Sequence, residues 1–84
     1  MIDIKFIENE NRAIALDDGK IIGECDFEVL ENTWNIVHTE VDSDYQGQGI
    51  AKKLVECVIE NAKLQDKTLV ADCSYAYKIL EKGK

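Results

Sequence analysis

Apolar and polar residues alternate along the first half of the chain, a pattern typical of strands with one buried face. The alternation is clearest over residues 2–8, and the runs 12–16, 20–30 and 33–41 are rich in β-forming side chains. Short clusters of Asn, Asp, Glu and Gly separate the runs, and an Asp-Gly pair between the second and third runs is a hairpin signal. Strands joined by such short turns pair antiparallel, so the first half predicts a meander.

The period of the pattern changes in the second half. From Ala51 to Ala62, apolar residues recur at helical spacing with charged residues opposite, which predicts a long amphipathic helix. Residues 68–71 indicate a short buried strand, and 76–82 a helix-like tail. A strand, a helix and a strand in succession need a crossover, which makes the two strands parallel. The predicted fold is α+β: a mixed, mostly antiparallel five-stranded sheet, one long helix after the fourth strand and a short C-terminal helix.

Length and composition narrow the class of protein. With 84 residues, we expect one domain over 1–84 with one core. The formal net charge of -7 argues against nucleic acid as a partner, and no apolar run is long enough for a membrane span. The three cysteines, Cys25, Cys57 and Cys73, lack the spacing of a zinc site or disulfide framework. The first residues lack the pattern of a signal peptide, so we expect a reduced, cytoplasmic protein without a metal.

The segment 41–51 carries the strongest chemical signal. A β-rich strand runs into a loop with Gly47 and Gly49, and the loop opens the amphipathic helix. The first amides of a helix lack intrahelical partners and lie at the positive end of its dipole, so this junction could bind a pyrophosphate. It matches neither a P-loop nor the dinucleotide fingerprint, because Lys52 occupies the third glycine position. On local physics alone, a loop whose glycines only ease the turn explains the pattern equally well.

A resemblance to a known family favours the binding interpretation. Residues 46–51 resemble the pyrophosphate-binding motif of the GNAT acetyltransferases, Gln/Arg-x-x-Gly-x-Gly/Ala, and match it at Gln46, Gly49 and Ala51. His-Thr-Glu-Val at 38–41 and Cys-Ser-Tyr at 73–75 resemble the short stand-alone branch of that family. The resemblance covers about residues 20–80 and implies a minimal GNAT-like fold that takes acetyl-CoA as cosubstrate. It implies that CoA contacts Val41, Gln46, Gly47, Gln48, Gly49, Ile50, Ala51 and Lys52.

The chain also departs from the full-length family pattern. Residues 8–12 leave no room for the helices that usually separate the first two strands and help to form the acceptor site. The acceptor pocket is therefore expected to be open or completed by a partner. Gln46 and Gln48 stand where Arg and Lys are common, and Asp42 and Asp44 lie nearby. We therefore expect weaker CoA binding than at a more basic site.

Acetyl transfer to an amine needs a base, because a lysine-like amine has a pKa near ~10.4. His38 and Glu40 are two apart on the fourth predicted strand, so they project to the same face, and either could serve as base. The alternatives are a half-buried histidine with a local hydrogen bond and a solvated glutamate at a strand end. Trp34 is expected to pack in the core, although simple alternation places it on the His38 face.

Cys73 follows the strand expected to lie parallel to the fourth one. Cysteine is commonly a small buried filler, and that is the default interpretation. The resemblance implies instead that Cys73 faces the thiol end of the cofactor. It could act there as nucleophile or acid, or it could only line the site. Tyr75 and Tyr77 are candidate proton donors to the leaving thiolate, with core packing as the alternative.

These observations leave three hypotheses of function. The first is an N-acetyltransferase that transfers acetyl from acetyl-CoA to an unidentified small-molecule or protein amine, with Cys73, His38 and Glu40 as candidate catalytic residues. The second is a non-catalytic CoA-binding or regulatory module. The third is a small interaction domain without a ligand. The sequence predicts no nucleic acid or membrane partner, and it leaves the oligomeric state open.

Overall fold

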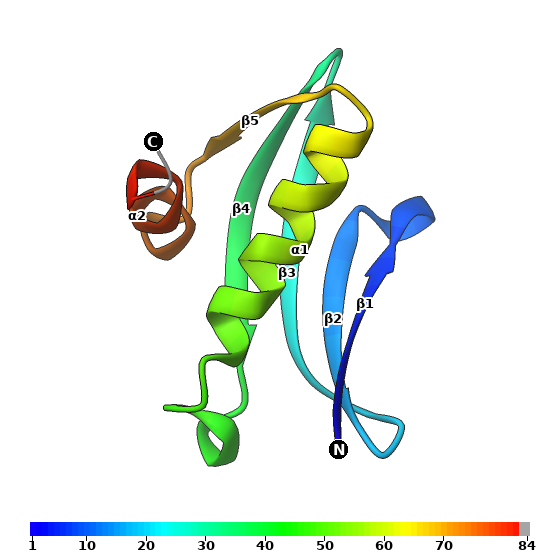
Figure 1. The fold of residues 1–84 in the computed structure, drawn as a ribbon, viewed down its shortest axis with the longest axis vertical. Helices are drawn as coiled ribbons and strands as arrows, with labels where there is room; N and C mark the ends of the chain where they lie inside the picture. Colours follow the sequence, from blue (N-terminus) through cyan, green and yellow to red (C-terminus); the bar gives the residue numbers. More distant parts are fainter. Residues whose placement is uncertain (83–84) are drawn as a thin grey trace.

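Residues 1–82 form one five-stranded sheet whose strands lie in the order of the sequence (Figure 1). The computed structural model describes residues 1–82. The first four strands pair antiparallel, and the fifth runs parallel to the fourth. The strands are β1 (Ile2–Ile7), β2 (Arg12–Asp17), β3 (Lys20–Leu30), β4 (Thr33–Val41) and β5 (Thr68–Ala71).

In the part of the chain that the structure describes, two α-helices accompany the sheet. The helix α1 (Ile50–Leu64) is the crossover between β4 and β5 and lies across one face of the sheet, whereas α2 (Ser74–Lys82) lies beside β5 (Figure 1). Single 3₁₀ turns occupy Glu8–Glu10 and Ser43–Tyr45. The predicted α+β fold is confirmed, including the mixed sheet, the long helix after the fourth strand and the short C-terminal helix.

The second helix begins two residues earlier than the predicted 76–82. The Tyr77 amide donates to the Cys73 carbonyl at 2.9 Å, the first hydrogen bond of the helix. Cys73 is therefore the N-cap residue, and Ser74 and Tyr75 belong to the first turn. Apolar periodicity could not locate this start, because the polar first turn does not contribute to the buried stripe.

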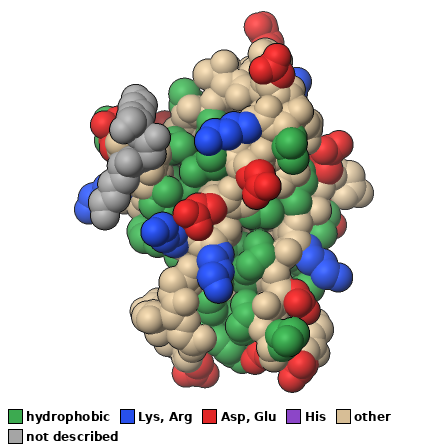
Figure 2. Space-filling model, viewed as in Figure 1, with side chains coloured by type: hydrophobic (Ala, Val, Ile, Leu, Met, Phe, Trp, Pro, Cys, Tyr) green, Lys and Arg blue, Asp and Glu red, His purple; other side chains and the backbone are tan. Residues whose placement is uncertain are grey.

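The core lies between α1 and the sheet. From α1, Leu54, Val55 and Val58 are fully buried. From the sheet, the rings of Phe6, Phe27 and Trp34 stack, with 4.4 Å between the centroids of Phe27 and Trp34. Figure 2 views this side of the molecule: charged side chains line the solvent face of the helix, and hydrophobic side chains show between the helix and its neighbours. The amphipathic pattern of α1 is therefore satisfied by the sheet it crosses.

A β-bulge in β4 decides which residues face α1. Asp26 of β3 pairs with His38, but the next residue, Phe27, pairs with Ile36, so β4 has one extra residue, Val37. The extra residue reverses the alternation of side chains beyond it. Trp34 is only 3% exposed in the core, whereas the side chain of His38 is 54% exposed. The expectation that Trp34 shares a face with His38 is therefore wrong, because it assumed a regular strand.

We predict that Leu54→Ala lowers the free energy of unfolding by about 2–5 kcal/mol, because it opens a cavity between α1 and the sheet. Leu54 is 0% exposed. The matched control is Leu64→Ala on the same helix, where the side chain is 78% exposed. Urea denaturation followed by circular dichroism measures both variants, and equal losses of stability would contradict this account of the core.

Candidate acetyl-CoA site

The loop between β4 and α1 presents free backbone amides. Gly47 and Gly49 adopt φ angles of 84° and 76°, in the left-handed region that glycine enters without strain. The first hydrogen bond of α1 runs from the Lys53 amide to the Gly49 carbonyl at 3.1 Å. No hydrogen bond within the described chain uses the amides of residues 47–52. Together with the helix dipole, these amides form a site for an anion.

A cavity of about 500 Å³ adjoins this loop. Six of the eight residues predicted to contact CoA line it: Val41, Gln46, Gly47, Gly49, Ile50 and Ala51. Gln48 and Lys52 are exposed and lie outside the lining. The cavity also includes Thr39, Tyr45 and Tyr75. It therefore extends from the glycine loop along β4 to the start of α2.

One edge of β4 beside the cavity is not paired with another strand. β5 pairs with β4 only from Thr33 to Ile36. The amides of Asp72 and Cys73 then both donate to the Ile36 carbonyl, at 2.9 and 3.1 Å, and the chain turns away into α2. Residues 37–41 therefore have no strand on their β5 side. An extended ligand with its own amides could pair with this edge in the manner of an added strand.

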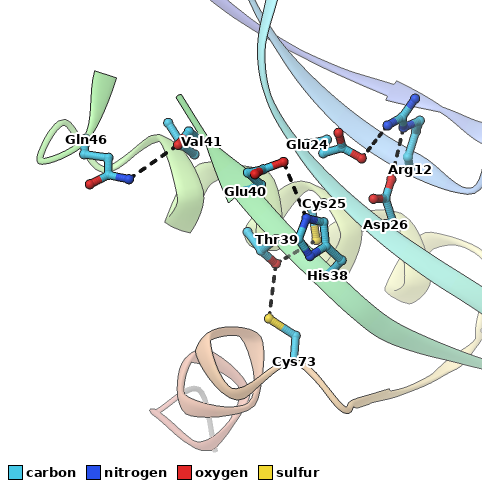
Figure 3. Close-up of polar contacts among 10 residues, drawn as sticks. All are labelled: Arg12, Glu24, Cys25, Asp26, His38, Thr39, Glu40, Val41, Gln46 and Cys73. Carbon is cyan, nitrogen blue, oxygen red and sulfur yellow. Dashed lines mark hydrogen bonds and ion pairs between the residues drawn. The ribbon is translucent and has the colours of Figure 1, made fainter. Parts of the chain in front are cut away.

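Tyr45 joins the glycine loop to the end of β2. Its hydroxyl donates to Asp17 Oδ2 at 2.5 Å. This bond lowers the pKa of the Asp17 carboxyl and raises the pKa of the Tyr45 phenol. The Gln46 side chain also reaches back, with Nε2 3.5 Å from the Val41 carbonyl (Figure 3). Both contacts restrict the loop that carries the free amides.

Cys73 is not among the residues that line the cavity, but it contacts one of them, Thr39. The Cys73 thiol is 3.6 Å from Thr39 Oγ1, and that hydroxyl in turn is 3.6 Å from the Cys25 sulfur (Figure 3). Partial burial raises the pKa of the Cys73 thiol, but hydrogen bonds from the Ala76 amide and the Thr39 hydroxyl, with smaller backbone contributions from Tyr75 and Thr39, outweigh it. The net pKa shift is downward, because the N-cap position offers a thiolate the first amides of α2.

The two candidate proton donors differ in position. Tyr75 lines the cavity that holds the free amides, and it is partly exposed. Tyr77 instead lines a separate groove with Leu69 and Leu80 between β5 and α2. Neither tyrosine is buried in the core. Of the two, only Tyr75 can reach a ligand in the cavity.

His38 and Glu40 lie on the opposite face of β4 from Thr39. His38 Nε2 is 3.6 Å from Glu40 Oε2, and the Glu40 side chain is 67% exposed (Figure 3). The bulge at Val37 turns this pair away from the α1 face. The structure therefore does not bring His38 and Glu40 together with the thiol of Cys73; the strand itself separates them.

The outer face also carries an ion cluster beside His38. Arg12 bonds to Glu24 and, through Nε at 3.0 Å, to Asp26 (Figure 3). Burial and the neighbouring Glu24 raise the pKa of Asp26 to about 6, and Arg12 opposes the rise. The pKa of Glu24 is lowered, chiefly by a hydrogen bond from Asp26. Two carboxyl groups thus lie beside one guanidinium, so Arg12 offsets only part of their negative charge when both are ionised.

Two further features bear on the type of protein. Within residues 1–82, no three His, Cys, Asp or Glu side chains are grouped so that they could hold a metal ion. Over the same residues, neither helix has the length and hydrophobicity that a membrane-spanning segment needs.

Comparison with known proteins identifies the family. The family model described as GCN5-related N-acetyl-transferase matches residues 12–84, and the chain belongs to this family. A GCN5-like protein from Staphylococcus aureus, solved in solution by NMR, shares 34% sequence identity. Its TM-score is 0.73, and the alignment covers 96% of this chain and 79% of that protein. No curated protein matches.

Longer acetyltransferases share the fold. An aminoglycoside acetyltransferase from a soil metagenomic sample, solved with sisomicin, shares 25% identity at a TM-score of 0.71, over 87% of this chain and 55% of that one. The PaiA N-acetyltransferase from Thermoplasma acidophilum, solved with coenzyme A, shares 16% identity at a TM-score of 0.69, over 86% and 48%. This chain spans about half the length of these two enzymes. Membership of the family supports acyl transfer as the class of reaction.

Two residues of the cavity were missed by sequence reasoning. Thr39 lies in the quoted His-Thr-Glu-Val segment, but strand alternation drew attention to its neighbours, and only the bulge turns it inward. Tyr45 contacts Asp17, which is 28 residues away in the sequence. No local pattern marks that contact, although Tyr45 stands two residues before Gly47 in the glycine loop.

We predict that Tyr45→Phe raises the pKa of Asp17, because the hydroxyl that donates to the charged carboxylate is lost. The stability from this bond is present above the ordinary pKa of an aspartate and disappears as the pH falls through the lowered value. The variant is therefore less stable than the wild type at neutral pH, and the two converge in acid. NMR titration of the Asp17 carboxyl measures the change in pKa, and melting curves at neutral and at acidic pH measure the change in stability. Tyr77→Phe, at an exposed residue of α2, is the control.

Proposed function

We propose that this protein is an N-acetyltransferase that takes acetyl from acetyl-CoA and gives it to an amine. The observation that carries the proposal is the set of free amides at residues 47–52, which open onto a cavity that continues to Thr39 and Tyr75. Membership of the GCN5-related family supports this reaction class.

The cavity suits the shape and chemistry of CoA. The amides of the glycine loop and the first turn of α1 would bind the pyrophosphate, and the unpaired edge at 37–41 offers hydrogen bonds to the amides of the pantetheine arm. With the cosubstrate in this direction, the thioester lies toward Cys73 and Tyr75. Asp42 and Asp44 lie beside the loop, so we expect modest affinity, with Lys52 and Lys53 as the local positive charge.

Cys73 is the proposed nucleophile. Its thiolate would attack the thioester carbonyl, forming a bond from sulfur to the acetyl carbon as the bond to the CoA sulfur breaks. The CoA thiolate leaves and takes a proton from Tyr75, which lines the cavity, or from water. A neutral amine then attacks the acetyl group on Cys73 and forms an amide, and the cysteine sulfur is released. The lowered pKa of Cys73 supports this role, because the thiolate is the reactive form.

The amine is proposed to arrive from the outer face of the sheet. His38 and Glu40 lie on that face, where no helix covers β4, and either can take the proton that an ammonium must lose before it attacks. The place where β5 leaves β4 is the proposed path between the two faces. On the same face, Glu24 and Asp26 of the neighbouring β3 carry negative charge that Arg12 offsets in part, and the remainder favours a cationic small molecule or a basic peptide over a neutral acceptor.

A CoA-binding module without catalysis is the second candidate. The specific observation behind it is the connection from β1 to β2, which consists of one 3₁₀ turn, Glu8–Glu10, and Asn11. No element in it can cover an acceptor on the outer face. For the enzyme, we also propose a cytoplasmic location, because its thiolate would need reducing conditions and the three cysteines are free thiols.

We predict that Gly49→Glu abolishes measurable binding of acetyl-CoA, because it puts a carboxylate among the amides that would hold the pyrophosphate. The matched control is Gly19→Glu in the hairpin between β2 and β3. Both glycines have a positive φ and open space where the new side chain begins, so both variants carry the same backbone strain. Isothermal titration calorimetry compares them. Equal binding by the two variants, or none by the wild type, refutes the assigned site.

We predict that Cys73→Ser reduces acetyl transfer on the order of 10²-fold or more, because the positioned thiolate is lost while the small cap of α2 is kept. Mass spectrometry after incubation with acetyl-CoA alone should find acetyl on Cys73 of the wild type. Cys57→Ser, at a half-buried position of α1, is the control and should keep both properties.

The same assay separates the two candidate functions. It offers the wild type polyamines, free lysine and basic peptides as acceptors. Binding of acetyl-CoA without transfer to any of them supports the module. Full transfer by Cys73→Ser would show that Cys73 only lines the site.

A further inference from the structure

Three side chains from three elements form a hydrogen-bonded row, and its middle member, Thr39, lines the cavity. Cys73 precedes α2, Thr39 is on β4 and Cys25 is on β3 (Figure 3). The Cys73 thiol donates to Thr39 Oγ1, and the Thr39 hydroxyl donates to the Cys25 sulfur, each over 3.6 Å. Thr39 and Cys25 are direct cross-strand partners, so the backbone fixes their spacing. Cys73 is the end of the row nearest to solvent, and Cys25 is completely buried.

The row can reverse its direction. A threonine hydroxyl rotates freely between donor directions and also accepts through its oxygen. If Cys73 loses its proton, the Thr39 hydroxyl can turn to donate to the thiolate, and the Cys25 thiol can turn to donate to the vacated Thr39 oxygen. In the reversed state both remaining protons of the row are donated along it, and the bond to the thiolate is charge-assisted.

Cys25 is suited to the inner end because it keeps its proton. Burial raises the pKa of Cys25 to about 12, so it stays a thiol throughout the range in which Cys73 ionises. A small apolar residue would fill the same space but could not donate a hydrogen bond to the Thr39 oxygen. A buried core thiol whose hydrogen-bond partner is a threonine hydroxyl thus acquires a chemical role beyond packing.

We propose that Thr39 is a positioning residue that holds the Cys73 sulfur, as thiolate, beside the cavity, with Cys25 as the partner that lets the hydroxyl reverse. The use of that thiolate in acetyl transfer rests on the proposed function. The control of its ionisation by Thr39 rests only on the row of contacts.

Other groups near Cys73 are not placed to influence its ionisation as Thr39 does. Tyr75 on α2 lines the cavity, and Cys57 on α1 lies on the core side. Asp72 precedes Cys73, but its carboxylate accepts a hydrogen bond from Asn35 Nδ2 at 2.9 Å. The charged pair His38 and Glu40 lies on the far side of β4. Among residues 1–82, Thr39 is the side chain that shares a hydrogen bond with the Cys73 sulfur, and its hydroxyl can donate once the thiol has lost its proton.

The test follows the rate of alkylation of Cys73 by iodoacetamide against pH, without acetyl-CoA and in a Cys57→Ser background. Peptide mass spectrometry separates Cys73 from Cys25. Thr39→Val keeps the shape and removes the hydroxyl, so the midpoint of the profile should move up. At neutral pH the rate should fall about tenfold, the change that one pKa unit produces. Thr39→Ser restores the hydroxyl and should restore the midpoint.

Each result supports or overturns the proposal. An unchanged midpoint in Thr39→Val, or one that Thr39→Ser fails to restore, overturns the role of Thr39. Cys25→Ala should move the midpoint in the same direction as Thr39→Val, and no movement overturns the role of Cys25. Melting curves verify that each variant is folded. Because the alkylation test contains no acetyl-CoA, its result does not depend on whether the protein transfers acetyl. If the alkylation profile overturns the role of Thr39, the Cys73→Ser assay still decides whether Cys73 takes part in transfer.

Discussion

The carbonyl of Ile36 is the point on which the site depends. It accepts hydrogen bonds from two successive amides, those of Asp72 and Cys73, and so ends the parallel pairing of β4 with β5. If pairing continued for another few residues, β5 would cover residues 37–41 and fill the space beside them. The early end leaves a bare strand edge, turns the chain into α2 and puts Cys73 at the N-cap of that helix. A single carbonyl that accepts two hydrogen bonds thus leaves the strand edge open and also fixes the position of Cys73 beside it.

The extra residue Val37 divides the chemistry between two faces. Beyond it, Thr39 and Val41 point to the side of α1, and His38 and Glu40 point to the other. A regular strand would have put the histidine and glutamate against the helix and the threonine in solvent. The bulge therefore gives the α1 face a thiol and a hydroxyl and the outer face a base and a carboxylate. Such a division suits a reaction whose two substrates approach from opposite sides of a sheet.

The sequence was sufficient for the architecture, because period two and period 3.6 are separate signals and the turns are short. The glycine loop was also predictable, since a strand, two glycines and an amphipathic helix follow one another directly. The face of the sheet on which His38 lies could not be predicted, because alternation cannot reveal one extra residue in β4. The Tyr45–Asp17 contact and the row through Thr39 join strands or loops distant in sequence, so only the tertiary structure brings these groups together.

The position of Cys73 at the start of α2 couples chemistry to mechanics. A negatively charged sulfur at that point satisfies amides of the first turn, whereas a sulfur that carries an acyl group has lost its charge and accepts those bonds poorly. Loading of the cysteine would therefore loosen the beginning of the helix, and unloading would tighten it again. Tyr75, which belongs to that first turn and lines the cavity, would feel this change directly. The order of the first turn of α2 would thus depend on whether the Cys73 sulfur carries an acyl group.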